Sequence, residues 1–297
     1  MSKQDECISC TLPDVQSTEE NRGKSIDRVG VGKFKLPILF EDQLRIAEIS
    51  SYVSLPHNIR GANFSRFIIT ATKHFSNKEL SSSTISKMLE DLRVIMKSAD
   101  AYVEIEFDYL IEKESPVTKI KGGYQGYKIG FIGLLRKDQS VIIRRFNIVG
   151  STTCPCSKSM SLLPQLLKEE DISVEKNPLL NQVGKGAHNQ RVNIRVDISL
   201  NNGFSLDTKD FIFHIENCAS AEVYPILKRP DEKWLTEKAY SRPRFVEDVV
   251  REVAVYLDKA DLSKKNIITG YSIRCIADES IHPHNAIAYL SKNWKLH

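Results

Sequence analysis

The sequence predicts an α+β protein in which antiparallel sheets carry helices on one face. Apolar and polar residues alternate strictly over 101–110 and again over 192–198, which is typical of half-buried antiparallel strands. Apolar residues recur at helical spacing over 84–97 and 245–257, and an alternating strand follows each helix. Because this helix-then-strand order occurs twice, about 165 residues apart, we expect two related halves in one chain.

The first half is predicted to hold one helix and several strands. A short strand over 33–40 contains Pro37, which cannot donate to a sheet ladder and therefore favours an edge position. Serines ahead of the helix over 84–97 are suited to cap it. After the strand at 101–110, the sequence predicts a glycine-rich turn at 122–126 and strands over 128–136 and 141–149.

The second half is predicted to repeat this pattern. Ser241 and Pro243 are expected to open a helix, and a strand over 267–276 follows it. Residues 159–186 are predicted to form a helix-like stretch and a polar connector, which we interpret as an insertion or a lid. We therefore expect a flexible polar tail over 1–28, a first half over 29–150 and a second half over 151–297, which carries most site residues. The apolar face of the second helix is expected to hold Phe245, Val249, Val253 and Leu257.

Composition excludes several classes of protein. Of the 297 residues, 41% are hydrophobic and 27% are charged, which indicates a globular chain rather than a disordered one. The net charge of +4 does not require a nucleic-acid partner but suits a small phosphorylated molecule. No run approaches the roughly 20 apolar residues of a membrane helix. The first ten residues, MSKQDECISC, lack the apolar core of a signal peptide, so a cytoplasmic location is expected.

Cysteines give the first chemical signal. A reducing cytosol disfavours disulfides, so each of the six cysteines is filler, metal ligand or nucleophile. Cys154 and Cys156 stand in TTCPCSK, where a thiolate is both nucleophile and soft metal ligand, and Lys158 is placed to lower its pKa. The alternative is a turn with one buried cysteine. Cys7 and Cys10 form a lone C-x-x-C in the tail, which is a weak metal or redox signal.

Two further motifs offer metal ligands. His188, in GAHNQR directly before a strand, suits a ligand or general base, although a lone histidine is more often structural. Glu222 lies beside Val223 and Tyr224, where an unpaired carboxylate is costly, so a partner is expected. One cysteine, one histidine and one glutamate would leave a zinc ion an open fourth position, which activates water.

Other polar residues allow both a chemical and a structural interpretation. Lys228 and Arg229 suit phosphate binding but equally a solvated surface. Glu237 could accept hydrogen bonds from the edge of a purine, or it could be a plain charge at the entry of a helix. His282 and His284 point the same way if the chain is extended, which suits metal ligation or proton transfer, while the alternative is a polar loop.

Together these motifs resemble the GTP cyclohydrolase IB family. The resemblance rests on CPCSK, GAHNQR, EVYPILKRPDEK, TEKAY followed by FVEDVVR, and ESIH-x-H, with VGVGKFKLPI and Ser-Arg-Phe at 65–67 in the first half. It runs from Val29 to the end of the chain. It implies a tandem tunnelling fold, a homotetramer with active sites at subunit interfaces, and zinc or manganese as metal. The implied reaction converts GTP and water into 7,8-dihydroneopterin triphosphate and formate, the first step of folate and pterin biosynthesis.

The resemblance also implies roles for individual residues. Cys154, His188 and Glu222 match the metal ligands, and Cys154 is also catalytic. Glu237 matches the carboxylate that anchors the purine or pterin ring. Either His282 or His284 would transfer protons. In the corresponding mechanism, the triphosphate would be bound by basic residues, for which the candidates are Lys185, Arg191, Lys228 and Arg229.

Two rival interpretations stay open at the sequence level. One is a thiol oxidoreductase or a nitrile reductase of the same fold, with Cys154 as covalent nucleophile and no metal. The other is a pterin- or nucleotide-binding protein without activity, in which zinc is structural. This chain also departs from the family, since about two dozen extra residues separate CPCSK from GAHNQ. The approach of Cys154 to His188 therefore requires that the extra segment loops out.

Overall fold

The computed structural model describes residues 15–137, 139–159, 186–201, 206–263 and 267–294. Cys7, Cys10, Lys185 and most of the connector 159–186 lie outside these residues. The chain forms two compact units: the first comprises Met1–Phe107 and Gly130–Ile143, and the second Asp108–Ile129 and Arg144–His297. Three long strands contribute to both units, namely β3 (Asp100–Lys113), β4 (Gly123–Arg136) and β5 (Gln139–Thr153). The structure thus combines helices with a large antiparallel sheet.

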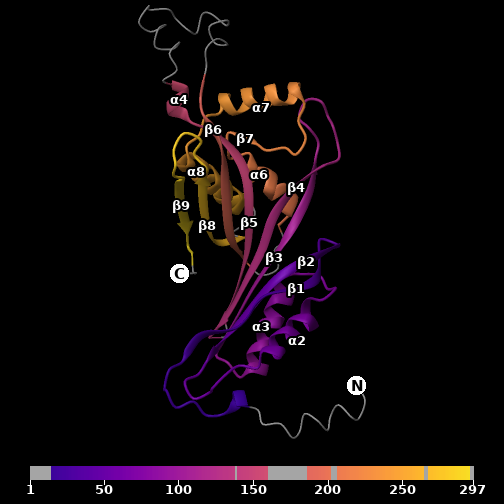
Figure 1. The fold of residues 1–297 in the computed structure, drawn as a ribbon, viewed down its shortest axis with the longest axis vertical. Helices are drawn as coiled ribbons and strands as arrows, with labels where there is room; N and C mark the ends of the chain where they lie inside the picture. The colour runs from indigo at the N-terminus through magenta and orange to yellow at the C-terminus, as the bar shows by residue number, and fades with distance from the viewer. Residues whose placement is uncertain (1–14, 138, 160–185, 202–205, 264–266, 295–297) are drawn as a thin grey trace, which may run out of the picture. The chain divides into compact units, whose positions relative to one another are not determined.

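The first unit packs two helices on the start of the sheet. After the short helix η1 (Val15–Ser17), strands β1 (Ile26–Phe40) and β2 (Gln43–Leu55) form an antiparallel pair, and β2 continues onto β3. β1 is an edge strand, as Pro37 predicts, but it begins well before residue 33. The helices α2 (Phe64–Phe75) and α3 (Ser82–Met96) lie side by side against these strands (Figure 1).

The sequence of α3 determines both its start and its buried face. Ser81 caps the helix, because its hydroxyl accepts a hydrogen bond from the Thr84 N–H at 3.1 Å. Ile85, Met88 and Leu89 are completely buried, which confirms the expected helix and its apolar stripe.

In the second unit the strands follow the order β3-β4-β5-β6-β8-β9, and the short β7 pairs with β5. The pairing of β6 with β8 runs from Val192 opposite Ala277 to Leu200 opposite Ile268. Its elements are α4 (Pro155–Ser159), β6 (Asn189–Leu200), α6 (Thr208–Glu216), β7 (Ala221–Glu222), α7 (Arg229–Ser241), α8 (Val246–Ser263), β8 (Ile268–Ala277) and β9 (Ala286–Lys292).

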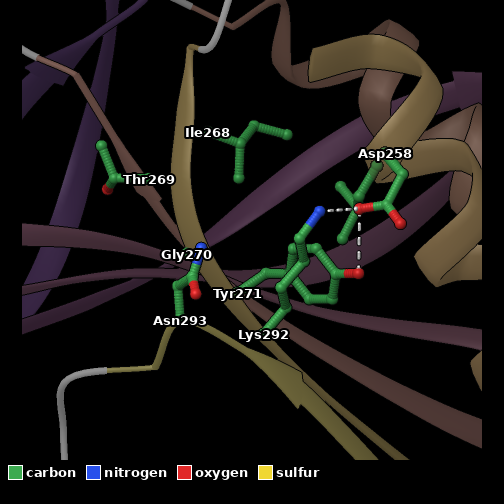
Figure 2. Close-up of a pocket in the computed structure, with 8 residues that line it drawn as sticks. Asp258, Ile268, Thr269, Gly270, Tyr271, Lys292 and Asn293 are labelled. Carbon is green, nitrogen blue, oxygen red and sulfur yellow. Dashed lines mark hydrogen bonds and ion pairs between the residues drawn. The ribbon is translucent and has the colours of Figure 1, made fainter. Parts of the chain in front are cut away.

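Helix α8 covers the last two strands. Its Asp258 accepts hydrogen bonds from the Tyr271 hydroxyl on β8, at 3.1 Å, and from the Lys292 ammonium on β9, at 3.0 Å (Figure 2). Val249, Val253 and Leu257 are completely buried, as expected for its apolar face. None of the described helices has both the length and the apolar content needed to cross a bilayer.

Three details of the expected elements were wrong. Ser241 ends α7 instead of opening the next helix, and Phe245 precedes α8 with 40% of its surface exposed. Gly123 and Gly126, expected in a turn, lie within β4. Gly123 provides room for a neighbouring segment, since a Cβ at this position would lie 2.7 Å from the Pro225 Cγ.

Helix α7 begins at a buried carboxylate. Asp231 is completely buried and accepts hydrogen bonds from the Val117 and Thr118 N–H groups, both at 2.8 Å, and from the Thr118 hydroxyl at 2.6 Å. It also accepts the Lys228 N–H at 2.9 Å. Burial alone would raise the pKa of Asp231, but these hydrogen bonds outweigh it and hold the pKa below its ordinary value. Asp231 therefore ties the start of α7 to the loop between β3 and β4.

This carboxylate predicts a specific pH dependence of stability. Because the folded pKa of Asp231 lies below the unfolded value of about 3.9, its stabilisation is present above about pH 4 and is lost as the pH falls through the folded pKa. We expect Asp231→Asn to lower the free energy of unfolding at neutral pH, and this deficit to shrink toward pH 3. Urea titrations of both proteins at several pH values measure the deficit, with the exposed neighbour in Glu232→Gln as control. A deficit that stays constant across the range would contradict this account.

Candidate functional site

The end of β5 meets the start of β6 at the two strongest candidate ligands. Cys154 directly follows β5 and His188 directly precedes β6, and the Cys154 N–H donates to the His188 carbonyl at 3.1 Å. Ser157 strengthens this contact, because its hydroxyl donates to the Cys154 carbonyl and accepts the His188 N–H, both at 3.2 Å. The structure therefore brings Cys154 and His188 together despite the extra residues between them.

Hydrogen bonds around the His188 ring determine which nitrogen is free. The Gln190 amide nitrogen donates to Glu279 at 3.2 Å, which turns the amide oxygen of Gln190 toward His188 Nδ1, at 2.8 Å. An amide oxygen only accepts, so the neutral tautomer that fits this contact carries its proton on Nδ1 and its lone pair on Nε2. Metal-binding histidines are typically prepared in this way by an acceptor on the second nitrogen.

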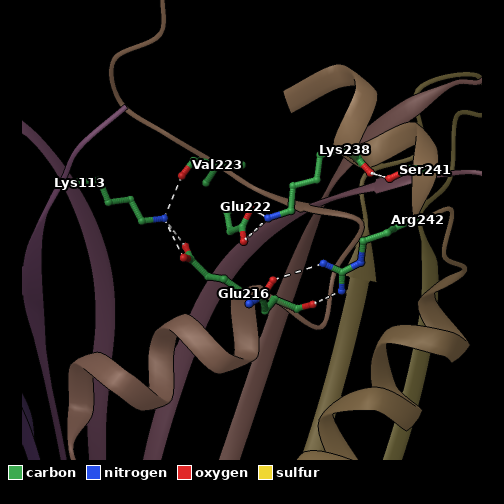
Figure 3. A network of polar contacts seen from close by, with 8 residues as sticks. Lys113, Glu216, Glu222, Val223, Lys238, Ser241 and Arg242 are labelled. Atoms are coloured by element: carbon green, nitrogen blue, oxygen red, sulfur yellow. Dashed lines mark hydrogen bonds and ion pairs between the residues drawn. The ribbon is translucent and has the colours of Figure 1, made fainter. Parts of the chain in front are cut away.

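Glu222 reaches the same end of β5 through a different pairing. Its strand, β7, runs antiparallel to β5, with Glu222 opposite Gly150. Both carboxylate oxygens accept from the Lys238 ammonium on α7, each at 2.7 Å (Figure 3). The partner expected for this carboxylate is therefore Lys238.

The three candidate ligands suit a divalent metal by their chemistry but are not gathered around one position. Cys154, His188 and Glu222 supply sulfur, nitrogen and oxygen, a donor set whose chemistry fits zinc or a similar divalent ion. Among the described residues, however, no three His, Cys, Asp or Glu side chains are gathered closely enough to hold a metal. Since Glu222 is paired with Lys238, its coordination of a metal would require it to exchange that ammonium for the ion.

The remaining cysteines in the described part of the chain are placed differently. Cys156 is exposed, whereas Cys218 and Cys275 are buried. Burial raises the pKa of Cys218 to about 11 and that of Cys275 to about 12, so both thiols stay protonated and inert near neutral pH. Cys154 is half-buried beside His188.

The two histidines of the last motif lie next to each other. The rings of His282 and His284 stack with centroids 5.1 Å apart and planes inclined by 15°. Both side chains are exposed, just before β9. The sequence predicted a shared direction from an extended chain, but the chain bends over residues 280–284, and the two rings lie nearly parallel because they stack.

The residues expected to bind substrate are exposed in this chain. The Glu237 side chain is 66% exposed on α7 and forms an i,i+4 ion pair with Lys233 at 3.6 Å. Arg191, Lys228 and Arg229 are also exposed, so the structure does not bring Glu237 and these cations into one enclosed site.

Three residues near the candidate ligands had no assigned role in the sequence. Lys238 and Glu279 stand inside motifs that were recognised, but Lys238 binds Glu222, 16 positions away, and Glu279 binds Gln190, 89 positions away. The position of Gln190 could have been inferred from the sequence. Side chains two residues apart on a strand point to the same face, and His188 lies two residues before Gln190, directly ahead of β6.

The family model for type I GTP cyclohydrolase FolE2 matches residues 12–288. A GTP cyclohydrolase FolE2 from Syntrophus aciditrophicus is 35% identical over 284 residues, covering 94% of this chain and 99% of the relative. One from Magnetococcus marinus is 31% identical over 289 residues, covering 95% and 97%.

Among solved structures, a hyper-thermostable uricase mutant superposes with a TM-score of 0.45 and 6% identity, covering 90% of this chain and 91% of its own. The family model and the curated relatives both extend over nearly the whole chain and agree with each other. They confirm that the chain is a type I GTP cyclohydrolase, but they give its family as FolE2, where the motifs had suggested the IB designation. The chain belongs to the type I GTP cyclohydrolase FolE2 family.

Proposed function

We propose that this enzyme hydrolyses GTP to 7,8-dihydroneopterin triphosphate and formate at a site built around Cys154 and His188, as the first step of folate or pterin biosynthesis. Family membership over nearly the whole chain supports the reaction. The placement of the site is supported by the backbone hydrogen bond that joins Cys154 to His188 across the 33 residues between them.

Cys154, His188 and Glu222 are the proposed ligands of one divalent ion, zinc or manganese. His188 would bind through Nε2, because Gln190 occupies Nδ1. Glu222 would contribute a carboxylate oxygen after leaving Lys238. When bound, the ion supplies Lewis acidity and lowers the pKa of water toward about 7.

The other residues of the proposal act on the substrate. Glu237 accepts hydrogen bonds from the guanine edge, so that C8 of the base faces the metal ligands. His282 or His284 transfers protons while two hydrolytic steps open the imidazole ring and release C8 as formate. The triphosphate is bound by basic residues, for which Arg191, Lys228 and Arg229 are available among the described residues and Lys185 lies outside them.

The proposal includes assembly of the site between subunits. Glu237, His282 and His284 are exposed in a single chain, and exposed polar groups gain catalytic strength only when water is excluded from them. A homotetramer of tandem tunnelling folds would cover them. Three further expectations from the sequence also stay predictions. They are a polar tail over 1–28, a division into halves at 29–150 and 151–297, and a cytoplasmic location.

The reaction is tested by replacing one of two neighbouring cysteines. We expect the metal-loaded protein to convert GTP to 7,8-dihydroneopterin triphosphate and formate, and to lose this activity when a chelator removes the metal. Cys154→Ala should lower kcat/KM by more than the 10- to 100-fold typical of losing an outer-shell partner, because a ligand itself is removed. Cys156→Ala, two residues away and exposed, is the control and should keep the activity. Product fluorescence after oxidation and metal content measure both effects.

Two outcomes would contradict the proposal. One is a folded Cys154→Ala protein with full metal content and full activity. The other is activity that survives chelation but depends on Cys154, since that behaviour belongs to a covalent thiol mechanism.

The ligand role of His188 makes a prediction for the metal-free protein. When its ring is neutral, His188 should carry its proton on Nδ1. Nitrogen-15 chemical shifts of the ring distinguish this tautomer from the Nε2–H form. Gln190→Leu removes the acceptor and should shift the population toward the Nε2–H form, whereas His214 should not respond. Finding the Nε2–H form in the unmodified protein would contradict the assignment.

A further inference from the structure

A buried lysine lies directly behind the segment that carries Glu222. Lys113, at the end of β3, is 6% exposed, and its ammonium donates to both carboxylate oxygens of Glu216 at 2.7 Å. The third contact of this ammonium is the Val223 carbonyl at 2.9 Å (Figure 3). A lysine ammonium has three N–H groups, so these three contacts use its whole donor capacity.

The surroundings of this ion pair are enclosed and aromatic. Glu216 is 1% exposed, and the Tyr127 hydroxyl also donates to it at 2.7 Å. Burial raises the pKa of the Glu216 carboxyl, and the Lys113 ammonium opposes that rise. The rings of Tyr127 and Tyr224 lie 5.7 and 5.1 Å from the ammonium. Removing one partner of such a pair leaves an uncompensated buried charge.

Stability alone is a weak explanation for this arrangement. A buried ion pair can often be replaced by neutral residues with little loss of stability, because desolvation offsets most of the attraction. The contact with Val223 is not needed to neutralise the buried charges of Lys113 and Glu216. It fixes the backbone immediately after Glu222, in a stretch that has no regular secondary structure before α7.

The same stretch is held at two further points by the same part of the chain. Gly123, at the start of β4, packs directly on Pro225. Asp231 accepts the Lys228 N–H together with those of Val117 and Thr118. The segment 223–231 thus rests on residues 113–123, and Lys113 is the contact nearest to Glu222.

We propose that Lys113 is a positioning residue for Glu222: by binding the Val223 carbonyl, it holds the Glu222 carboxylate where it can pass from Lys238 to a divalent ion. Lys113 does not touch the ion or the substrate in this proposal. The inference rests on the proposed role of Glu222 as a metal ligand, and it adds a determinant of metal affinity that lies 109 positions away in the sequence.

The test compares two neutral versions of the buried pair. Lys113→Met and Lys113→Gln are each combined with Glu216→Gln, so that neither protein contains a buried charge and an oxygen remains for the Tyr127 hydroxyl. The two proteins differ in one respect: a glutamine amide can donate to the Val223 carbonyl and a methionine cannot. Zn²⁺ affinity is measured by competition with a chromophoric chelator, and thermal unfolding of the metal-free proteins is measured by circular dichroism.

We expect the methionine version to bind Zn²⁺ about 10-fold more weakly than the glutamine version at similar thermal stability, the size of effect that outer-shell partners have. Tyr127→Phe is the matched control, because it removes a hydrogen bond from Glu216 but leaves the contact with Val223. It should lower the unfolding temperature without changing Zn²⁺ affinity. Equal affinity of the methionine and glutamine versions would overturn the role of Lys113.

Glu222→Gln separates this inference from the proposed function. If Glu222→Gln binds Zn²⁺ as tightly as the unmodified protein, the ligand assignment itself is wrong. If Glu222→Gln weakens binding while the methionine and glutamine versions agree, Glu222 is a ligand and only the positioning role of Lys113 fails.

Discussion

A single backbone hydrogen bond, from the Cys154 N–H to the His188 carbonyl, sets the geometry of the candidate site. It lies where β5 ends and β6 begins, so the sheet itself brings the two motifs together and the residues between them need not form part of the site. β7 pairs with the same end of β5 and carries Glu222. All three candidate ligands are therefore positioned by one strand, whose pairing cannot shift by a residue without turning every side chain to the other face.

Clusters of polar side chains fix the segments that are not part of the sheet. Asp231 binds the start of α7 to the loop after β3, and Lys113 binds the segment after Glu222 to the end of β3. Gln190 and Glu279 orient the His188 ring. Each cluster is buried or half-buried with its donors and acceptors paired, and such networks are costly when incomplete and rigid when complete. Rigidity of this kind suits a site that must keep three ligands in place while Glu222 changes partner.

The sequence predicted the elements with a clear period and missed those without one. The alternating strands at 101–110 and 192–198 and the amphipathic helices α3 and α8 were found because burial of one face imposes that period. The helix α2 was missed because Ile68, Ile69, Thr70 and Thr72 are β-branched and favour strands on local grounds. Strand β9 was missed because its outward residues, Ile287 and Tyr289, are exposed although apolar.

Motifs predicted the candidate ligands but not what supports them. Cys154, His188 and Glu222 were named from short residue patterns, and the structure adds Gln190, Lys238 and Lys113 as their neighbours. Lys113 gives no local signal, because its contacts with Glu216 and Val223 span more than 100 positions. The exposed positions of Glu237, His282 and His284 could not be read from the sequence either, since exposure depends on the surrounding fold.

Anomalous diffraction from crystals of the zinc-loaded assembly can show whether one divalent ion binds Cys154, His188 and Glu222. We expect one strong peak at about 2.3 Å from the Cys154 sulfur and about 2.0–2.2 Å from His188 Nε2 and a Glu222 oxygen. Lys238 should have released Glu222 in the same crystals. A peak held by other residues, or Glu222 still paired with Lys238 beside a bound ion, would show that this ligand set is wrong.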